Sequence, residues 1–164
     1  MRYASIRELD ISNGTGVGIA LFVQGCNKHC FNCFNPDTWD FNGGKEWDEN
    51  TFKKLIILLS RPYITRITFL GGEPLANENV EEVYKIIKYI KEKYPDKAIW
   101  LYTGETIEDK YFAENFNNFL VKTIKECDIV IDGPYVNELR DLRLKFRGSS
   151  NQRIIDIKES LKQK

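Results

Sequence analysis

The sequence has no surplus of charge and no long apolar run, and each of these absences excludes a class of protein. Its 164 residues include 24 basic and 24 acidic ones, so the formal net charge is zero. Bulk nucleic-acid binding needs a basic surplus. No run approaches the roughly 18 apolar residues of a transmembrane helix, and the first residues lack the apolar core of a signal peptide. We therefore expect a cytoplasmic protein without a nucleic-acid or membrane partner.

The sequence also lacks repeats, low-complexity tracts and linkers. A chain of 164 residues fits one domain. Such a chain can bury roughly 70% of its unfolded surface, so it needs no disulfide to hold it. We expect residues 1–164 to form a single domain.

Cysteine is scarce as well, but three of the four cysteines stand close together. Cys26, Cys30 and Cys33 have the spacing C-x3-C-x2-C, whereas Cys127 lies far along the chain. Reduced thiols in the cytoplasm act as ligands or catalysts rather than as disulfides. Three thiolates can bind three irons of a 4Fe–4S cluster, which normally takes four cysteines. One iron would remain open, and an open metal position is typical of catalytic sites.

A zinc site or three unrelated core cysteines are the alternatives for this motif. Zinc ribbons pair one C-x2-C with another or with histidines. The only histidine, His29, lies inside the loop next to Cys30, where a site with three cysteines and one histidine would be cramped. The spacing therefore favours the cluster.

Apolar runs alternate with amphipathic stretches along the rest of the chain. The apolar runs predict strands at residues 19–23, 66–70, 98–102 and 128–132, with a last short strand at 153–157 before a terminal helix. Helical spacing predicts helices at 49–59, 79–94 and 112–126. This order predicts an α/β fold with a mostly parallel sheet and crossover helices.

Ligands of parallel sheets bind at the carboxyl ends of the strands. The loops that follow the predicted strands at 19–23, 66–70, 98–102 and 128–132 all contain glycine, and we expect these four loops to meet at that edge. Paired glycines at Gly71 and Gly72 let a backbone approach a ligand closely. Glu73 beside them can accept hydrogen bonds from an ammonium group. Thr103 and Asp132 lie at the ends of the next two strands and are further candidates, although turn chemistry alone also accounts for such residues.

The cysteine motif resembles that of the radical S-adenosylmethionine superfamily, and Gly71-Gly72-Glu73 resembles its GGE motif. The resemblance implies a partial, open (β/α) barrel that binds a 4Fe–4S cluster and S-adenosylmethionine. In that superfamily the reduced cluster cleaves S-adenosylmethionine to a 5′-deoxyadenosyl radical, which abstracts hydrogen. The three motif cysteines would bind the cluster. The implied contacts to S-adenosylmethionine are Asn32, Gly71, Gly72, Glu73, Thr103 and Asp132. No catalytic side chain beyond the cluster and cofactor is expected.

Three longer stretches narrow the resemblance: residues 23–41, residues 100–104, and residues 146–153 with the sequence F-R-G-S-S-N-Q-R. Together they resemble the activating proteins of anaerobic ribonucleoside-triphosphate reductases, which belong to the glycyl-radical enzyme activases. The resemblance implies an oxidoreductase that forms a glycyl radical on the large subunit of that reductase, with flavodoxin or ferredoxin as electron donor. The alternatives are an activase of another glycyl-radical enzyme and an iron–sulfur electron-transfer protein without S-adenosylmethionine chemistry.

The sequence departs from related activases at one place. They often carry the stretch D-G-P-G-x-R before the first predicted strand, and this chain has N-G-T-G-V-G at residues 13–18. The glycines are kept, so a tight turn is expected. The proline and the arginine are missing, and Gly18 stands where the arginine would be.

Overall fold

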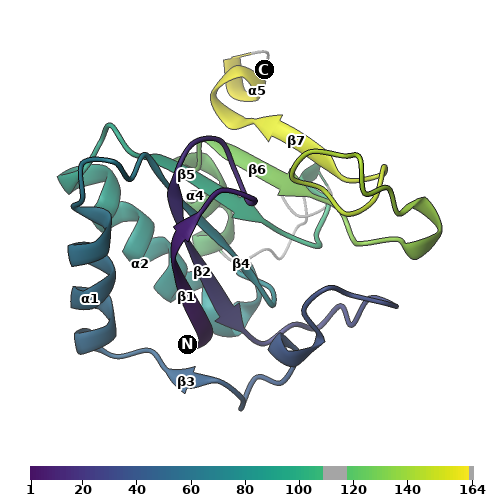
Figure 1. Cartoon of the computed structure of the whole chain (residues 1–164), viewed down its shortest axis with the longest axis horizontal. Coiled ribbons are helices and arrows are strands. Elements are labelled where there is room, and N and C mark those ends of the chain that lie inside the picture. Colours follow the sequence, from purple (N-terminus) through teal and green to yellow (C-terminus); the bar gives the residue numbers. More distant parts are fainter. Residues whose placement is uncertain (109–117, 163–164) are drawn as a thin grey trace.

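The computed structural model describes residues 1–108 and 118–162, and it is built on one sheet (Figure 1). The seven strands are β1 (Arg2–Asp10), β2 (Gly18–Gln24), β3 (Lys45–Glu46), β4 (Arg66–Gly71), β5 (Ala98–Tyr102), β6 (Ile129–Asp132) and β7 (Arg153–Asp156). They lie in the order β3-β1-β2-β4-β5-β6-β7. The four neighbouring strands β2, β4, β5 and β6 are parallel to one another. The outer pairings, β3 with β1, β1 with β2, and β6 with β7, are antiparallel. The described strands thus form an open, mixed sheet that is parallel in the middle.

Helices connect the parallel strands. They are α1 (Glu49–Leu59), α2 (Asn77–Lys93) and α4 (Asn118–Glu126), while α5 (Ile157–Lys162) follows β7. Two short 3-10 turns, η1 (Pro36–Thr38) and η2 (Asn137–Leu139), lie in the loops. Because crossovers between parallel strands are right-handed, equal steps along the sheet place their helices on one face. Among the described helices, none is long and apolar enough to cross a membrane.

The central elements confirm the prediction from the sequence. The four predicted parallel strands and the predicted helices at 49–59 and 79–94 are present, with ends that differ by at most two residues. The strand predicted at 153–157 ends one residue earlier, at Asp156, and the terminal helix begins at Ile157. Of the helix predicted at 112–126, the described part begins at Asn118, and residues 112–117 lie outside the described residues.

The strand β1 has no counterpart among the predicted strands. Its pairing with β2 shifts register between Tyr3 and Ser5, and again between Arg7 and Asp10. A shift of one residue reverses which side chains face the core. The alternation of apolar and polar residues, by which a half-buried strand is predicted, is therefore interrupted in β1.

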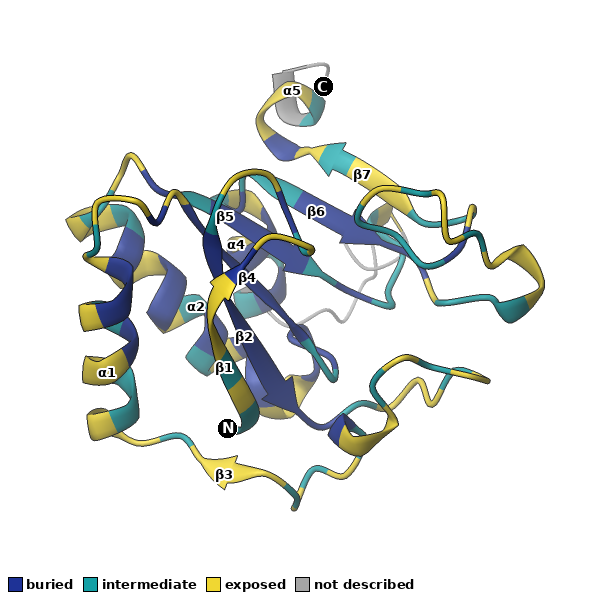
Figure 2. Cartoon of the chain, in the orientation of Figure 1, coloured by how far each residue is buried: buried dark blue, intermediate teal, exposed yellow. Residues whose placement is uncertain are grey.

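The two faces of β2 have different partners. Ile19, Leu21 and Val23 have no exposed surface and pack with α1 and α2 in the main core. Ala20 and Phe22 face the opposite side, in a small cluster with residues of β4 and β5. Because successive side chains alternate, a strand covered on both faces reads as one apolar run. Figure 2 shows this burial as a dark band along the central strands.

Candidate active site

A cavity of about 440 Å³ lies at the carboxyl ends of the parallel strands. This volume is within the range of about 300–1,000 Å³ that is usual for small-molecule sites. Seven of the predicted site residues line it: Cys26, Cys30, Cys33, Gly71, Gly72, Glu73 and Thr103. The expectation that the loops after these strands meet at one edge is confirmed. Figure 1 shows the segments after β2 and β6 extending from the same side of the sheet.

Two of the predicted contacts do not line this cavity. The side-chain amide of Asn32 lies 3.4 Å from Asn137 Oδ1 in η2. Asp132 is 1% exposed, and Arg153 donates to its two oxygens at 2.9 and 2.5 Å. The backbone amide of Ile107 donates to the same carboxylate at 3.0 Å. Asp132 therefore joins β6 to β7 and to the connection after β5, and Gly133 beside it reaches the cavity.

The cysteine loop, residues 25–34, is fixed where it leaves β2. The amide of Gly25 donates to Thr38 O at 2.7 Å, and Gly25 O accepts a hydrogen bond from the amide of Glu73 at 2.7 Å. Gly25 has a φ of 105°, and a Cβ there would lie 2.1 Å from the ring of Phe41. Within the loop, the amide of Lys28 donates to the sulfur of Cys26 at 3.4 Å. Hydrogen bonds of this kind tune the potential of iron–sulfur clusters.

The chemistry and placement of the three loop thiols fit a cluster. All three are partly exposed in one cavity, whereas Cys127 is completely buried in the main core. In the described part of the chain, no three His, Cys, Asp or Glu side chains are arranged around a single metal ion. A cubane cluster does not need such convergence, because each cysteine binds a different iron. Burial raises the pKa of the Cys26 thiol, and amide hydrogen bonds from Lys28 and His29 oppose this rise in part.

Glu73 is the buried carboxylate of the cavity, with 1% of its surface exposed. Its Oε1 accepts a hydrogen bond from the Gly104 amide at 2.7 Å. Its Oε2 accepts from the Leu75 amide at 3.0 Å and from Thr103 Oγ1 at 2.9 Å. Burial raises the pKa of Glu73 to about 7, and these hydrogen bonds lower it only in part. Among the described residues, Gly104 is the one hydrogen-bond donor to Oε1. Since a carboxylate oxygen can accept two hydrogen bonds, Oε1 can accept a second one from a ligand.

The glycine pair brings Glu73 and the cysteine loop into direct contact. A Cβ on Gly72 would lie 2.3 Å from Gly25 O and 2.9 Å from Thr38 O. Gly71 has a φ of 113°, which side chains disfavour. These two positions need glycine, and the contact fixes the distance between the carboxylate and the thiols.

Residues 147–152 form a turn that packs on the cysteine loop. Gln152 Oε1 accepts hydrogen bonds from the amides of Gly148 at 2.8 Å and Ser149 at 3.1 Å. The hydroxyl of Ser149 accepts from the Val136 amide at 3.2 Å. A Cβ on Gly148 would lie 2.6 Å from the ring of Phe34. The stretch at residues 146–153, one of the three that resemble the activating proteins, therefore contacts Phe34, the residue after Cys33.

Several polar residues of the cavity were not predicted: Arg7, Ser12, Asn13, Lys28 and Arg147. The first three come from the end of β1 and the loop after it, where the sequence gives no clear strand signal. Lys28 forms an ion pair with Glu105 at 3.0 Å. The one sequence signal for Lys28 as a cavity residue is its position between Cys26 and Cys30 of the cysteine motif.

Comparison with known proteins identifies the family. Residues 12–155 match the model of a family described as a 4Fe-4S single cluster domain. The chain is 38% identical over 154 residues to the anaerobic ribonucleoside-triphosphate reductase-activating protein of Enterobacteria phage T4, covering 94% of this chain and 93% of the relative. The proteins of the same name from Salmonella typhi and Escherichia coli strain K12 are 34% identical over 154 residues, covering 93% of this chain and 96% of each relative. The chain therefore belongs to the family of anaerobic ribonucleoside-triphosphate reductase-activating proteins, with their 4Fe-4S single cluster domain.

Proposed function

We propose that this protein is a radical S-adenosylmethionine activase that generates a glycyl radical on the large subunit of an anaerobic ribonucleotide reductase. Flavodoxin or ferredoxin would supply the electron. When bound, a 4Fe–4S cluster would supply the electron for the reductive cleavage of S-adenosylmethionine to methionine and a 5′-deoxyadenosyl radical, and that radical would take a hydrogen atom from a glycine Cα. The observation that carries the proposal is the placement of three thiols and the Glu73 carboxylate in one cavity. The relatives, which are named as activating proteins of anaerobic ribonucleoside-triphosphate reductases, support it.

Different residues of the cavity would bind the cluster and S-adenosylmethionine. Cys26, Cys30 and Cys33 would hold the cluster, and their soft thiolates suit iron–sulfur chemistry. The second acceptor position on Glu73 Oε1 would receive an N–H of the amino group of S-adenosylmethionine. Thr103 holds that carboxylate in place from the side of β5 at 2.9 Å.

The backbone and the border of the cavity complete the proposed site. Gly71 and Gly72 would let the chain approach S-adenosylmethionine closely. Asn32 and Asp132 stand outside the lining, so we assign them a supporting part in cofactor binding, Asp132 through Gly133. The open sheet, with helices on one face and the cavity on the other, supports the interpretation as a partial (β/α) barrel.

Exposed apolar side chains beside the cavity support the proposal that the substrate is another protein. Phe31 is 73% exposed and Leu142 is 79% exposed, and Leu142 and the half-exposed Phe34 line the cavity. Large exposed apolar side chains that gather at one place mark surfaces for interaction with other proteins. A macromolecular substrate such as the reductase would cover them.

Anaerobic reconstitution tests the proposed function. The protein should take up about four irons per chain, and dithionite with S-adenosylmethionine should give methionine and 5′-deoxyadenosine. Adding an anaerobic reductase should then give a glycyl radical signal in electron paramagnetic resonance. Cys26→Ala, Cys30→Ala and Cys33→Ala should each abolish product, and Cys127→Ala is the matched control.

The outcomes separate the alternatives. Iron uptake without cleavage of S-adenosylmethionine would indicate an electron-transfer protein. Cleavage without a radical on a folded cognate reductase would indicate an activase of another glycyl-radical enzyme.

A further inference from the structure

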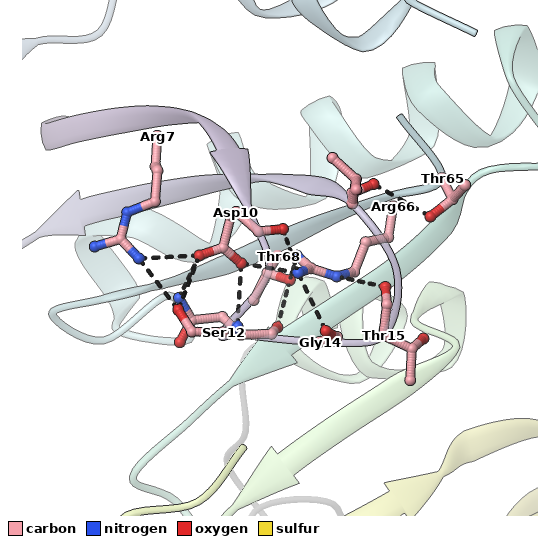
Figure 3. A network of polar contacts seen from close by, with 10 residues as sticks. Arg7, Asp10, Ser12, Gly14, Thr15, Thr65, Arg66 and Thr68 are labelled. Atoms are coloured by element: carbon pink, nitrogen blue, oxygen red, sulfur yellow. Dashed lines mark hydrogen bonds and ion pairs between the residues drawn. The ribbon is translucent and has the colours of Figure 1, made fainter. Parts of the chain in front are cut away.

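Arg66, the first residue of β4, holds the loop between β1 and β2 in place (Figure 3). This loop, residues 11–17, is called the glycine loop below. Arg66 is 1% exposed. Its guanidinium donates to Thr15 O at 3.0 Å, Thr68 Oγ1 at 2.7 Å, Asp10 O and Oδ2 at 2.8 Å each, and Gly14 O at 3.3 Å. Nε and Nη1 each make one of these contacts and Nη2 makes three, so the two N–H groups of Nη2 are shared among three acceptors.

The same network reaches the wall of the cavity. The second oxygen of Asp10, Oδ1, accepts hydrogen bonds from Asn13 Nδ2 at 2.8 Å and from Ser12 Oγ at 3.3 Å. The amide of Asn13 donates to Asp10 Oδ2 at 3.1 Å, and Asn13 O accepts from Thr68 Oγ1 at 2.8 Å. Ser12 and Asn13 line the same cavity as the three cysteines. Arg66 therefore acts on the cavity through Asp10 and the glycine loop.

The Asp10 carboxylate depends on this arginine. It is 1% exposed, and its ion pair with Arg66 is buried on both sides at 2.8 Å. Burial by itself would raise the pKa of Asp10, but hydrogen bonds from Arg66, Asn13 and Arg7 bring the pKa below its ordinary value. Without Arg66, the buried Asp10 carboxylate would keep as its ionic partner, within the described part of the chain, only the half-exposed Arg7, which contacts Oδ1 at 3.0 Å. Removing one member of a buried ion pair is strongly destabilising.

The space for the guanidinium comes from glycines. Gly18 of β2 and Arg66 of β4 are register partners in neighbouring parallel strands. A Cβ on Gly18 would lie 2.6 Å from Arg66 Cγ and 2.7 Å from Nη1, and one on Gly14 would lie 2.4 Å from Nε. A side chain at position 18 and the arginine at position 66 would therefore compete for one volume.

We propose that Arg66 is a positioning residue of the active site, which holds Ser12 and Asn13 against the bound ligand through the glycine loop. Gly18 is its steric complement, so an arginine at position 18 with glycine at position 66 would serve the same loop from the neighbouring strand. This inference rests on the proposed function only for the identity of the ligand, S-adenosylmethionine.

The test compares Arg66→Gly, Gly18→Arg and the double variant, each with its cluster reconstituted anaerobically. Two quantities are measured: the affinity for S-adenosylmethionine by equilibrium dialysis, and amide hydrogen exchange in residues 11–17. Arg66→Gly should weaken the affinity by about tenfold to a hundredfold, the usual effect of losing a supporting contact. It should also speed exchange in the glycine loop without loss of iron. The double variant should recover most of the affinity and the protection.

A matched control separates positioning from general loss of stability. Lys91→Met removes an ion pair of 2.8 Å with Asp128, and neither residue lines the cavity. It should leave both the affinity and the exchange of the glycine loop unchanged. Weakening by Lys91→Met as large as that by Arg66→Gly would refute a specific role for Arg66.

Each remaining outcome decides the question. Native affinity and native loop protection in Arg66→Gly would overturn the proposal, and so would a folded double variant that recovers neither. If Arg66→Gly does not fold, the double variant decides: recovery of fold and affinity supports the proposal, and failure to fold overturns it. If the native protein does not bind S-adenosylmethionine, the proposed function fails, while hydrogen exchange still reports whether Arg66 fixes the loop.

Discussion

Replacing Gly72 by alanine should uncouple Glu73 from the cysteine loop. The added Cβ would lie 2.3 Å from Gly25 O and 2.9 Å from Thr38 O. Both neighbours are backbone atoms, so neither can move aside by a side-chain rotation. Real Cβ atoms essentially never come closer than 3.0 Å, so the gap to Gly25 O must widen by at least about 0.7 Å, a displacement that matters for a positioned reaction.

The size of the effect follows from this displacement. The hydrogen bond from the Glu73 amide to Gly25 O, now 2.7 Å, would be stretched or lost, which costs about 1 kcal/mol. Overpacking adds about 1–3 kcal/mol, so the melting temperature should fall by several degrees. A shift of about 1 Å between reacting groups can cost about a hundredfold in rate. We therefore expect the cleavage of S-adenosylmethionine to fall by about that factor.

The assay is the rate of 5′-deoxyadenosine formation by the reconstituted protein under reductant, with iron content and melting temperature measured on the same sample. Gly104→Ala is the matched control in the same cavity, because its Cβ would meet the flexible Lys28 side chain at 3.1 Å and would lie at an ordinary contact distance of 3.4 Å from Glu73 Oε1. It should lose far less activity. A Gly72→Ala protein that keeps native activity would refute the view that this contact sets the geometry of the site.

Three further predictions concern single residues. Because the folded-state pKa of Glu73 is raised to about 7 from 4.5, its contribution to stability is full below pH 4.5 and is lost as the pH rises through 7. Without S-adenosylmethionine, urea unfolding should show a loss of about 3 kcal/mol across this range, and an equal slope in Glu73→Ala would contradict it. Cys127→Ala should keep the iron content, since this thiol is completely buried in the main core; loss of iron would refute the three-ligand assignment. Gln152→Ala leaves the amides of Gly148 and Ser149 without their acceptor, so thermal unfolding should show a loss of about 1–3 kcal/mol; an unchanged melting temperature would contradict this.

The sequence was sufficient to predict the elements that build the site. The buried parallel strands appear as apolar runs, and the rule that their carboxyl ends share an edge brings the thiols and Glu73 together. These signals are local, because a few consecutive residues decide each strand and each turn. The apolar run that becomes β2 shows this most directly, since both of its faces are covered.

The parts that could not be predicted depend on contacts between distant residues. The irregular register of β1 removes the alternation that marks a strand. The burial of Arg66 is set by its partners Asp10, Gly14 and Thr15, all more than fifty residues earlier in the chain. An arginine at the start of a strand ordinarily indicates solvent exposure. Asp132 shows the converse: its place at the end of a strand suggested a contact to a ligand, but its carboxylate accepts hydrogen bonds from Arg153 of the adjacent strand.

The register between Gly18 and Arg66 also restricts the evolution of this chain. With arginine at both positions the space is overfilled, and with glycine at both the buried Asp10 carboxylate keeps, among the residues described, only the half-exposed Arg7 as its ionic partner. Either order of substitution passes through a less stable protein than the two end points. A mutation at one position is therefore harmful or acceptable according to the residue at the other. We expect the two positions to change together among homologues, with one arginine shared between neighbouring strands.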